Sequence, residues 1–121
     1  MANYSDIKGF TVQTVSNDPA ASAAASGSWT SGGTMNTGRS DLAGLGIKTS
    51  AMAVAGYSGS TSSAVENYDG TSWTEIAELN TARNSLGGFG ATNTASIACG
   101  GRSPTTNKTE SWNGSSWTEV N

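Results

Sequence analysis

The chain contains no histidine, and this absence removes the commonest general base and the commonest metal ligand of proteins. Only 12% of its 121 residues are charged. The three lysines and three arginines form no basic stripe for phosphate groups, so we do not expect nucleic-acid binding. The low charge also argues against the kind of disorder that repulsion among like charges sustains.

Cysteine is nearly absent as well, because Cys99 is the only one and no internal disulfide can form. It lies in the apolar run 95–100, which predicts a buried and unreactive thiol. No apolar run approaches the roughly 20 residues that span a bilayer. The N-terminus lacks the basic region followed by an apolar region that marks a secretory signal. We therefore expect a soluble chain without membrane insertion.

What the chain does contain is an internal repeat. Trp29, Trp73 and Trp117 stand 44 residues apart, and the segments 29–72 and 73–116 are identical at 14 of 44 positions. Composition alone would give about four matches, so the repeat is real. A period of this length is typical of arrays whose units bury their apolar faces only against one another.

Each repeat is expected to form four short antiparallel strands. Gly, Ser, Thr and Asn around short apolar runs fit an all-β array with many tight turns. Asp69-Gly70 and Asn113-Gly114 recur at one phase of the period and predict type I′ hairpins. Trp29–Thr30 matches the start of a fourth strand that precedes the first full unit. We place the strands at 42–46, 50–55, 64–68 and 72–76, and at 86–90, 94–99, 106–112 and 116–120.

Residues 1–26 lie outside the repeat and are interpreted as an N-terminal anchoring arm and linker. Gly9–Val15 alternates apolar and polar residues, which predicts a short strand, and the Ala/Ser-rich stretch after it predicts a linker. The strand could add to the edge of another protein's sheet, or it could cover the edge of the first repeat in the same chain. The remaining residues, 27–121, form a domain of two repeats, 29–72 and 73–116, plus the start of a third.

The order of features within the repeat resembles kelch repeats. A Trp is followed ten residues later by an Arg, then by a Gly-rich strand, an apolar strand that ends in Gly, and Glu-x-Tyr/Trp-Asp/Asn before the next Trp. This resemblance covers residues 27–121 and implies the four-stranded blades of a β-propeller. The first repeat departs from the pattern at Gly56-Tyr57, where the second Gly is missing. The most specific elements are Arg39, Tyr68, Trp73, Arg83, Gly100, Gly101, Trp112 and Trp117.

Three further segments are similar to kelch-like structural proteins of marine tailed phages. Two belong to the repeat, Leu-Asn-Thr-Ala-Arg and Asn-Gly-x-Ser-Trp-Thr-Glu-Val, and the third is the opening Met-Ala-Asn-Tyr-Ser-Asp-Ile-Lys-Gly-Phe-Thr-Val-Gln-Thr. This second resemblance implies a virion location and a structural role.

We predict no catalytic residue, metal or cofactor. Some kelch propellers are copper oxidases, but their histidines have no counterpart here. Paired carboxylates are the remaining route to hydrolysis. The glutamates recur with the repeat phase, which is typical of structural residues; they are Glu66, Glu75, Glu78, Glu110 and Glu119.

Four residues are candidates for ligand binding, each with a structural alternative. Arg39 and Arg83 could line a channel and hold an acidic ligand, or they could tie strands together by pairing with Glu66 or Glu110. Trp73 and Trp117 could stack on sugars, or they could fill the space between blades together with the other repeat aromatics. Recurrence once per repeat favours the structural role of the arginines, and the large area that each aromatic ring buries favours it for the tryptophans.

Two blades cannot close a propeller, which typically has four to eight, and an open pair would leave apolar faces in water. We therefore expect a homo-oligomer, for example a trimer of six blades in which the Trp29 strand crosses to a neighbour. The favoured function is a non-enzymatic virion protein of a phage, as a capsid decoration or a tail or fibre component. Residues 1–26 would bind a capsid or tail protein, and the module could attach to a host glycan. The alternatives are a cellular kelch-type adaptor and a fragment of a larger propeller enzyme.

Overall fold

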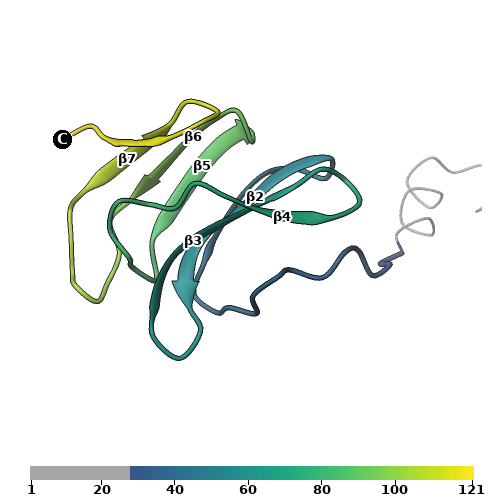
Figure 1. Cartoon of the computed structure of the whole chain (residues 1–121), viewed down its shortest axis with the longest axis horizontal. Coiled ribbons are helices and arrows are strands. Elements are labelled where there is room, and N and C mark those ends of the chain that lie inside the picture. The colour runs from purple at the N-terminus through teal and green to yellow at the C-terminus, as the bar shows by residue number, and fades with distance from the viewer. Residues whose placement is uncertain (1–27) are drawn as a thin grey trace, which may run out of the picture. The chain divides into compact units, whose positions relative to one another are not determined.

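The computed structural model describes residues 28–121, and Gly32–Asn121 form one compact unit. This part of the chain contains eight strands and no helix, so the predicted all-β class is confirmed for it (Figure 1). The predicted strand Gly9–Val15 and the linker after it lie outside the described residues. Trp29 and Thr30 belong to no strand, because a strand exists only where a neighbour accepts its backbone hydrogen bonds.

The eight strands form two separate antiparallel sheets of four. In each sheet every strand pairs with the next one along the chain, so both sheets are meanders. Every predicted strand overlaps an observed one, and the ends differ by three residues or fewer. The first sheet contains β1 (Ala43–Ile47), β2 (Ser50–Tyr57), β3 (Thr61–Tyr68) and β4 (Trp73–Ile76), and the second contains β5 (Gly87–Thr92), β6 (Ala95–Cys99), β7 (Thr109–Trp112) and β8 (Trp117–Glu119).

The two sheets pack face to face (Figure 1), and β1 lies beside β5. Their close approach depends on Gly88, because a Cβ at this position would lie 2.9 Å from the Cβ of Ala43. The core between the sheets contains residues of β1, β2 and β3 on one side and residues of β6, β7 and β8 on the other. Its main members are Ala43, Met52, Val54, Val65, Leu79, Ala98, Trp112 and Trp117.

The structural repeat is offset by one residue from the ungapped sequence repeat in strands β2 and β6. Ala43 pairs with Val54, whereas its counterpart Gly87 pairs with Cys99, 45 residues after Val54. The extra residue lies in the β5–β6 hairpin, where the register shifts between Phe89 and Thr92. The offset matters because a slip of one residue moves every side chain of a strand to the opposite face.

This offset corrects the expectation of a missing glycine at Gly56-Tyr57. Ala55 and Gly56 have φ values of 58° and 114°, and Gly100 and Gly101 have 64° and 119°. Ala55-Gly56 is therefore the counterpart of Gly100-Gly101, and the left-handed turn is present in both repeats. Ala55 is completely buried in the core and adopts this left-handed conformation, which favours glycine.

The β3–β4 and β7–β8 hairpins recur as predicted, but the type I′ assignment is wrong. Only the glycines, Gly70 and Gly114, have positive φ, and they occupy the first central position, which is the arrangement of type II′ turns. The residue before each glycine instead closes the turn with its side chain. Asp69 Oδ1 accepts hydrogen bonds from the N–H groups of Thr71 and Ser72, both at 2.8 Å, and Asn113 Oδ1 accepts the equivalent pair.

Hydrogen bonds from the Ser72 and Thr71 N–H groups lower the pKa of Asp69 below its ordinary value of 3.8. They favour the charged carboxylate because an N–H donor stabilises negative charge. Asn113, at the same position of the second repeat, makes the same turn without a titratable group. The two turns therefore share the bonds from the two main-chain N–H groups but differ in their dependence on pH.

Candidate functional site

Two buried ion pairs lie at equivalent positions of the two repeats. Arg39 Nη2 lies 2.9 Å from Glu66 Oε1, and Arg83 Nη2 lies 3.1 Å from Glu110 Oε1. All four side chains have no solvent exposure. Glu66 is on β3 and Glu110 is on β7, whereas each arginine comes from the loop that precedes the first strand of its sheet. Each pair therefore fastens a loop to the third strand of its own sheet.

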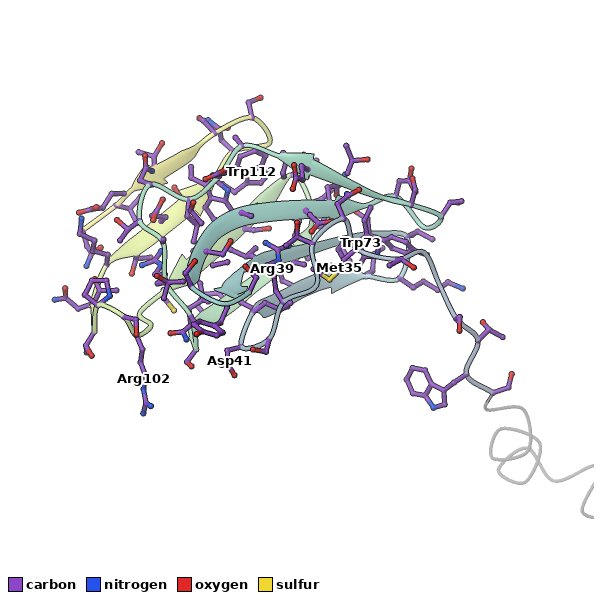
Figure 2. All side chains as sticks on the ribbon, turned by 60° about the horizontal axis from the view of Figure 1, so that its bottom comes forward. Met35, Arg39, Asp41, Trp73, Arg102 and Trp112 are labelled. Carbon is purple, nitrogen blue, oxygen red and sulfur yellow. The ribbon has the colours of Figure 1, made fainter. Side chains whose placement is uncertain are left out.

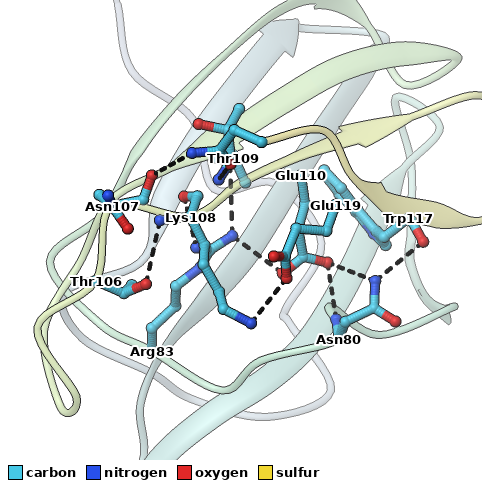
Figure 3. A network of polar contacts seen from close by, with 11 residues as sticks. Asn80, Arg83, Thr106, Asn107, Lys108, Thr109, Glu110, Trp117 and Glu119 are labelled. Carbon is cyan, nitrogen blue, oxygen red and sulfur yellow. Dashed lines mark hydrogen bonds and ion pairs between the residues drawn. The ribbon is translucent and has the colours of Figure 1, made fainter.

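The asparagine of the Asn-Thr-x-Arg motif completes each cluster. Asn80 donates from its backbone N and from Nδ2 to Glu110 Oε2, both at 2.8 Å, and Nδ2 also donates to the Trp117 carbonyl at 3.0 Å (Figure 3). Asn36 makes the same three bonds to Glu66 and to the Trp73 carbonyl. The asparagine of the motif thus binds the third and fourth strands of its sheet, and the arginine neutralises the buried carboxylate. These two roles account for the spacing of the motif.

Each arginine also donates to main-chain carbonyl groups. Arg39 Nη1 donates to Ala64 at 2.6 Å and Arg83 Nη1 to Lys108 at 2.9 Å. The pairing with Glu66 and Glu110 that the sequence offered as an alternative is the arrangement observed. The guanidinium groups present no exposed surface to an acidic ligand, whereas Arg102 is exposed and extends away from the chain (Figure 2).

The aromatic residues of the two repeats form matching ring pairs with different exposure. Trp112 and Trp117 have ring centroids 5.3 Å apart, and both are only 6% exposed. Tyr68 and Trp73 have centroids 5.0 Å apart, but both are half-buried. Trp117 is therefore a core residue and offers no platform for a sugar. The Trp29 side chain is fully exposed, at 102%.

Trp73 borders a shallow hollow of about 330 Å³. Because Trp117 is buried, this hollow is the remaining candidate for a binding site beside one of the two tryptophans. Its other lining residues are Asn36, Thr74 and Glu75. An aromatic ring beside amide, hydroxyl and carboxylate groups suits a polar ligand with an apolar face, such as a sugar. The indole Nε1 is already engaged, because it donates to the Gly33 carbonyl at 3.1 Å. The ring face is thus the part of Trp73 that a ligand would contact.

One polar residue of structural importance was missed by the sequence analysis. Asn93, in the β5–β6 turn, connects the two sheets through hydrogen bonds to Asn67 and Ser50 of the first sheet, at 2.5 and 2.8 Å. Its carbonyl accepts a bond of 2.8 Å from Trp112 Nε1. Asn93 lies beside the inserted residue that breaks the ungapped repeat, so no recurring motif marks it.

No protein-family model matches this chain, and no curated protein resembles it at a significant level. Within residues 28–121, no three or more Cys, Asp or Glu side chains gather as a metal site would require. The same part of the chain has no helix that is long and apolar enough to span a membrane.

Proposed function

We propose that this chain is a non-enzymatic structural and binding protein of a phage virion, which displays a kelch-like module as a capsid decoration or as a tail or fibre component. The observation that carries this proposal is the use of the recurring polar residues. Arg39, Glu66, Arg83 and Glu110 are all consumed by buried pairs that fasten loops to strands. Residues that recur for structural reasons indicate a repeating building unit.

The geometry of the two sheets supports the kelch-like part of the proposal. Each sheet is a four-stranded meander, and the first strands of the two sheets, β1 and β5, are the closest neighbours. In a propeller the first strands of successive blades line the central channel, so a contact between β1 and β5 is the one expected if the two sheets are consecutive blades. Further copies would complete the ring, and three copies would supply six blades.

The virion part of the proposal is supported by the resemblance of the opening residues and of the repeat to kelch-like phage structural proteins. Residues 1–26 would bind a capsid or tail protein, and a host glycan would bind the module on a surface that assembly leaves uncovered. The exposed surface of the module carries few charges, which suits contact with a neutral glycan more than contact with a charged polymer.

Mass spectrometry of purified particles, followed by immunogold labelling with an antibody raised against residues 32–121, tests the proposal. We expect the chain in the particle at a constant ratio to the major capsid or tail protein, with gold on one part of the particle. Its absence from purified particles, together with its presence among the soluble proteins of the infected or uninfected cell, would contradict the virion role and favour a cellular adaptor.

A further inference from the structure

Two sheet faces have no covering sheet within the described residues, and they lie on opposite sides of the molecule's two-sheet core. One belongs to the second sheet and is named here the Phe89 face; it carries Gly87, Phe89, Ile97, Cys99 and Ser111. The other belongs to the first sheet and is named the Gly44 face; it carries Gly44, Ala51, Tyr68 and Trp73.

The contact inside the chain shows what such faces fit. The first sheet presents Leu45, Met52 and Val54 toward the second sheet. A Cβ at Gly88 would lie 3.3 Å from Leu45 Cδ2, and Ser96 Oγ lies 3.7 Å from Met52 Sδ. The contact thus joins large apolar side chains of one sheet to small residues of the next.

The Phe89 face corresponds to the side of this contact that Leu45, Met52 and Val54 of the first sheet form. By the structural offset between the repeats, Phe89 is the counterpart of Leu45, and Ile97 and Cys99 are the counterparts of Met52 and Val54. Val54 and Met52 are 0% and 1% exposed, whereas Phe89 is 58% exposed. The second sheet therefore offers the same kind of apolar surface, on which no other sheet packs within the described residues.

The Gly44 face corresponds to the other side of the contact, which the second sheet forms around Gly88. Gly44 is the counterpart of Gly88, and Tyr68 and Trp73 are the counterparts of the buried Trp112 and Trp117. A Cβ at Gly44 would meet no atom within 4 Å, whereas a Cβ at Gly88 meets the neighbouring sheet. The Gly44 face is thus a surface of small and aromatic residues that no sheet within residues 28–121 covers.

Backbone hydrogen bonds between the repeats follow the same pattern. Gly56 N donates to the Arg83 carbonyl at 3.0 Å, and Ser85 N donates to the Asp41 carbonyl at 2.9 Å. The counterparts of these donors are Gly101 N and Asp41 N, and neither donates to another main-chain carbonyl in the part of the chain that the structure describes. A second copy placed like the second sheet would supply the Arg39 carbonyl to Gly101, and its Asp41 N would reach the Ser85 carbonyl.

The Phe89 face is also hollowed where an incoming turn would fit. A recess of about 370 Å³ lies beside Phe89, Ile97, Ser111 and Trp112. At the equivalent place on the first sheet, Asn93 of the β5–β6 turn docks against Ser50 and Asn67. The β1–β2 turn at Lys48–Thr49 of another copy is the counterpart of that element.

We infer that the Phe89 face of one copy binds the Gly44 face of a second copy, in a head-to-tail contact that reproduces the contact between the two sheets of a single chain. Such a contact uses two different surfaces and generates a ring when the rotation closes. The inference rests on the homo-oligomer of the proposed function and does not depend on the virion role.

Sedimentation velocity of the full chain tests the contact with the substitutions Gly44→Val and Gly38→Val. Both glycines have open space at their Cβ and no positive φ, so neither substitution clashes within one chain. A valine at Gly44 would project into the covering sheet of a second copy, as a Cβ at Gly88 meets the first sheet, whereas Gly38 lies outside the Gly44 face. We expect sedimentation to show an oligomer of defined mass for the wild type and for Gly38→Val, and a monomer for Gly44→Val. Circular dichroism should show that the Gly44→Val monomer is folded.

The single cysteine gives a second readout that does not depend on mass. Cys99 is half-buried in one chain, and the contact would cover it as the first sheet's Val54 is covered. We expect its labelling by a thiol reagent to slow by about tenfold or more on assembly, because reactivity follows exposure. The Gly44→Val variant should keep the fast rate.

Mixing two blocked variants decides the matter even where one of them folds poorly alone. Gly44→Val retains an intact Phe89 face, and Phe89→Asp retains an intact Gly44 face. A head-to-tail contact predicts that each variant is monomeric and that an equimolar mixture gives a complex of one copy of each. A monomeric wild type at micromolar concentration would overturn the homo-oligomer itself. An oligomeric wild type whose mass is unchanged by Gly44→Val, or a mixture that forms no complex, would overturn this contact alone.

Discussion

At the scale of single residues, the molecule is held by polar side chains in places where small β-proteins usually rely on apolar ones. Glu66 and Glu110 are completely buried, and each is surrounded by donors from an Asn-Thr-x-Arg motif. A buried carboxylate is costly unless it is paired and hydrogen-bonded. Both glutamates meet these conditions, so the clusters fix where each loop lies on its sheet.

Removing one partner of a buried pair should be far more damaging than removing one partner of an exposed pair. Arg83→Ala leaves Glu110 buried without its counter-charge, so we expect a loss of about 3–5 kcal/mol in the free energy of unfolding. Lys108→Ala is the matched control, because Lys108 and Glu119 form a pair 2.8 Å apart with side chains 43% and 37% exposed. Its loss should be about 1 kcal/mol or less. Denaturant unfolding measures both, and equal losses would contradict the structural role of the cluster.

The two equivalent tryptophans of the fourth strands should respond differently to truncation. Trp117 is 6% exposed and belongs to the core, so Trp117→Ala should cost about 3–5 kcal/mol in the free energy of unfolding. Trp73 is only half-buried in a single chain, so Trp73→Ala should cost clearly less in a monomeric background such as Gly44→Val. In the wild-type background it should weaken assembly. Thermal unfolding and sedimentation separate the two effects; a loss of glycan binding alone would assign Trp73 to a sugar site instead.

At the scale of elements, the strands could be predicted because several of them, such as β2, β3, β6 and β7, end within two residues of a glycine with positive φ. What could not be predicted depends on single residues. Asp69 and Asn113 were assigned to type I′ turns, but their side chains bond to the following N–H groups and leave the positive φ to the glycine. The inserted residue in the β5–β6 hairpin shifted β6 by one position relative to β2. An ungapped repeat cannot reveal such a shift.

The burial of Cys99 shows why part of the site also escaped prediction. Its apolar run predicted a buried thiol, yet the side chain is only half-buried. Val54, at the same place in the first sheet, is completely covered because the second sheet packs on it. Sequence specifies which face of a strand is apolar, whereas burial depends on whether another sheet is present. The same reasoning separates Trp73 from Trp117.

The two turns provide a paired test of pH dependence. The folded-state pKa of Asp69 lies below its ordinary value of 3.8, so its stabilising effect is present above that value and disappears as the pH falls through the lowered pKa. We expect Asp69→Asn to lose this part of the acid sensitivity, because the amide oxygen accepts the same bonds without titrating. Asn113→Asp should gain an equivalent sensitivity. Thermal unfolding from neutral to strongly acidic pH measures the difference, and unchanged slopes in both variants would contradict it.

At the scale of the whole molecule, a well-packed core lies between the two sheets, and two further sheet faces are covered by no other sheet within residues 28–121. The core between the sheets buries Met52, Val54 and Trp112, whereas Phe89 remains 58% exposed and a Cβ at Gly44 would meet no atom within 4 Å. Exposed apolar surface of this kind marks a place of association in soluble proteins. The Phe89 face and the Gly44 face correspond to the two sides of the contact between the sheets. The proposed assembly therefore uses the same kinds of side chain that already join the two repeats.

The last prediction concerns residues 1–26, which share no phase with the repeat, so the packing of the repeat does not explain them. If this segment binds a capsid or tail protein, deleting residues 1–15 should leave the oligomer of residues 32–121 intact and abolish its recovery with particles. The comparison is made by sedimentation for assembly and by quantitative mass spectrometry of purified particles for incorporation. Gly38→Val serves as the control that should assemble and incorporate normally. Normal incorporation of the truncated chain would contradict the anchoring role, and loss of its fold would instead show that Gly9–Val15 serves the first repeat.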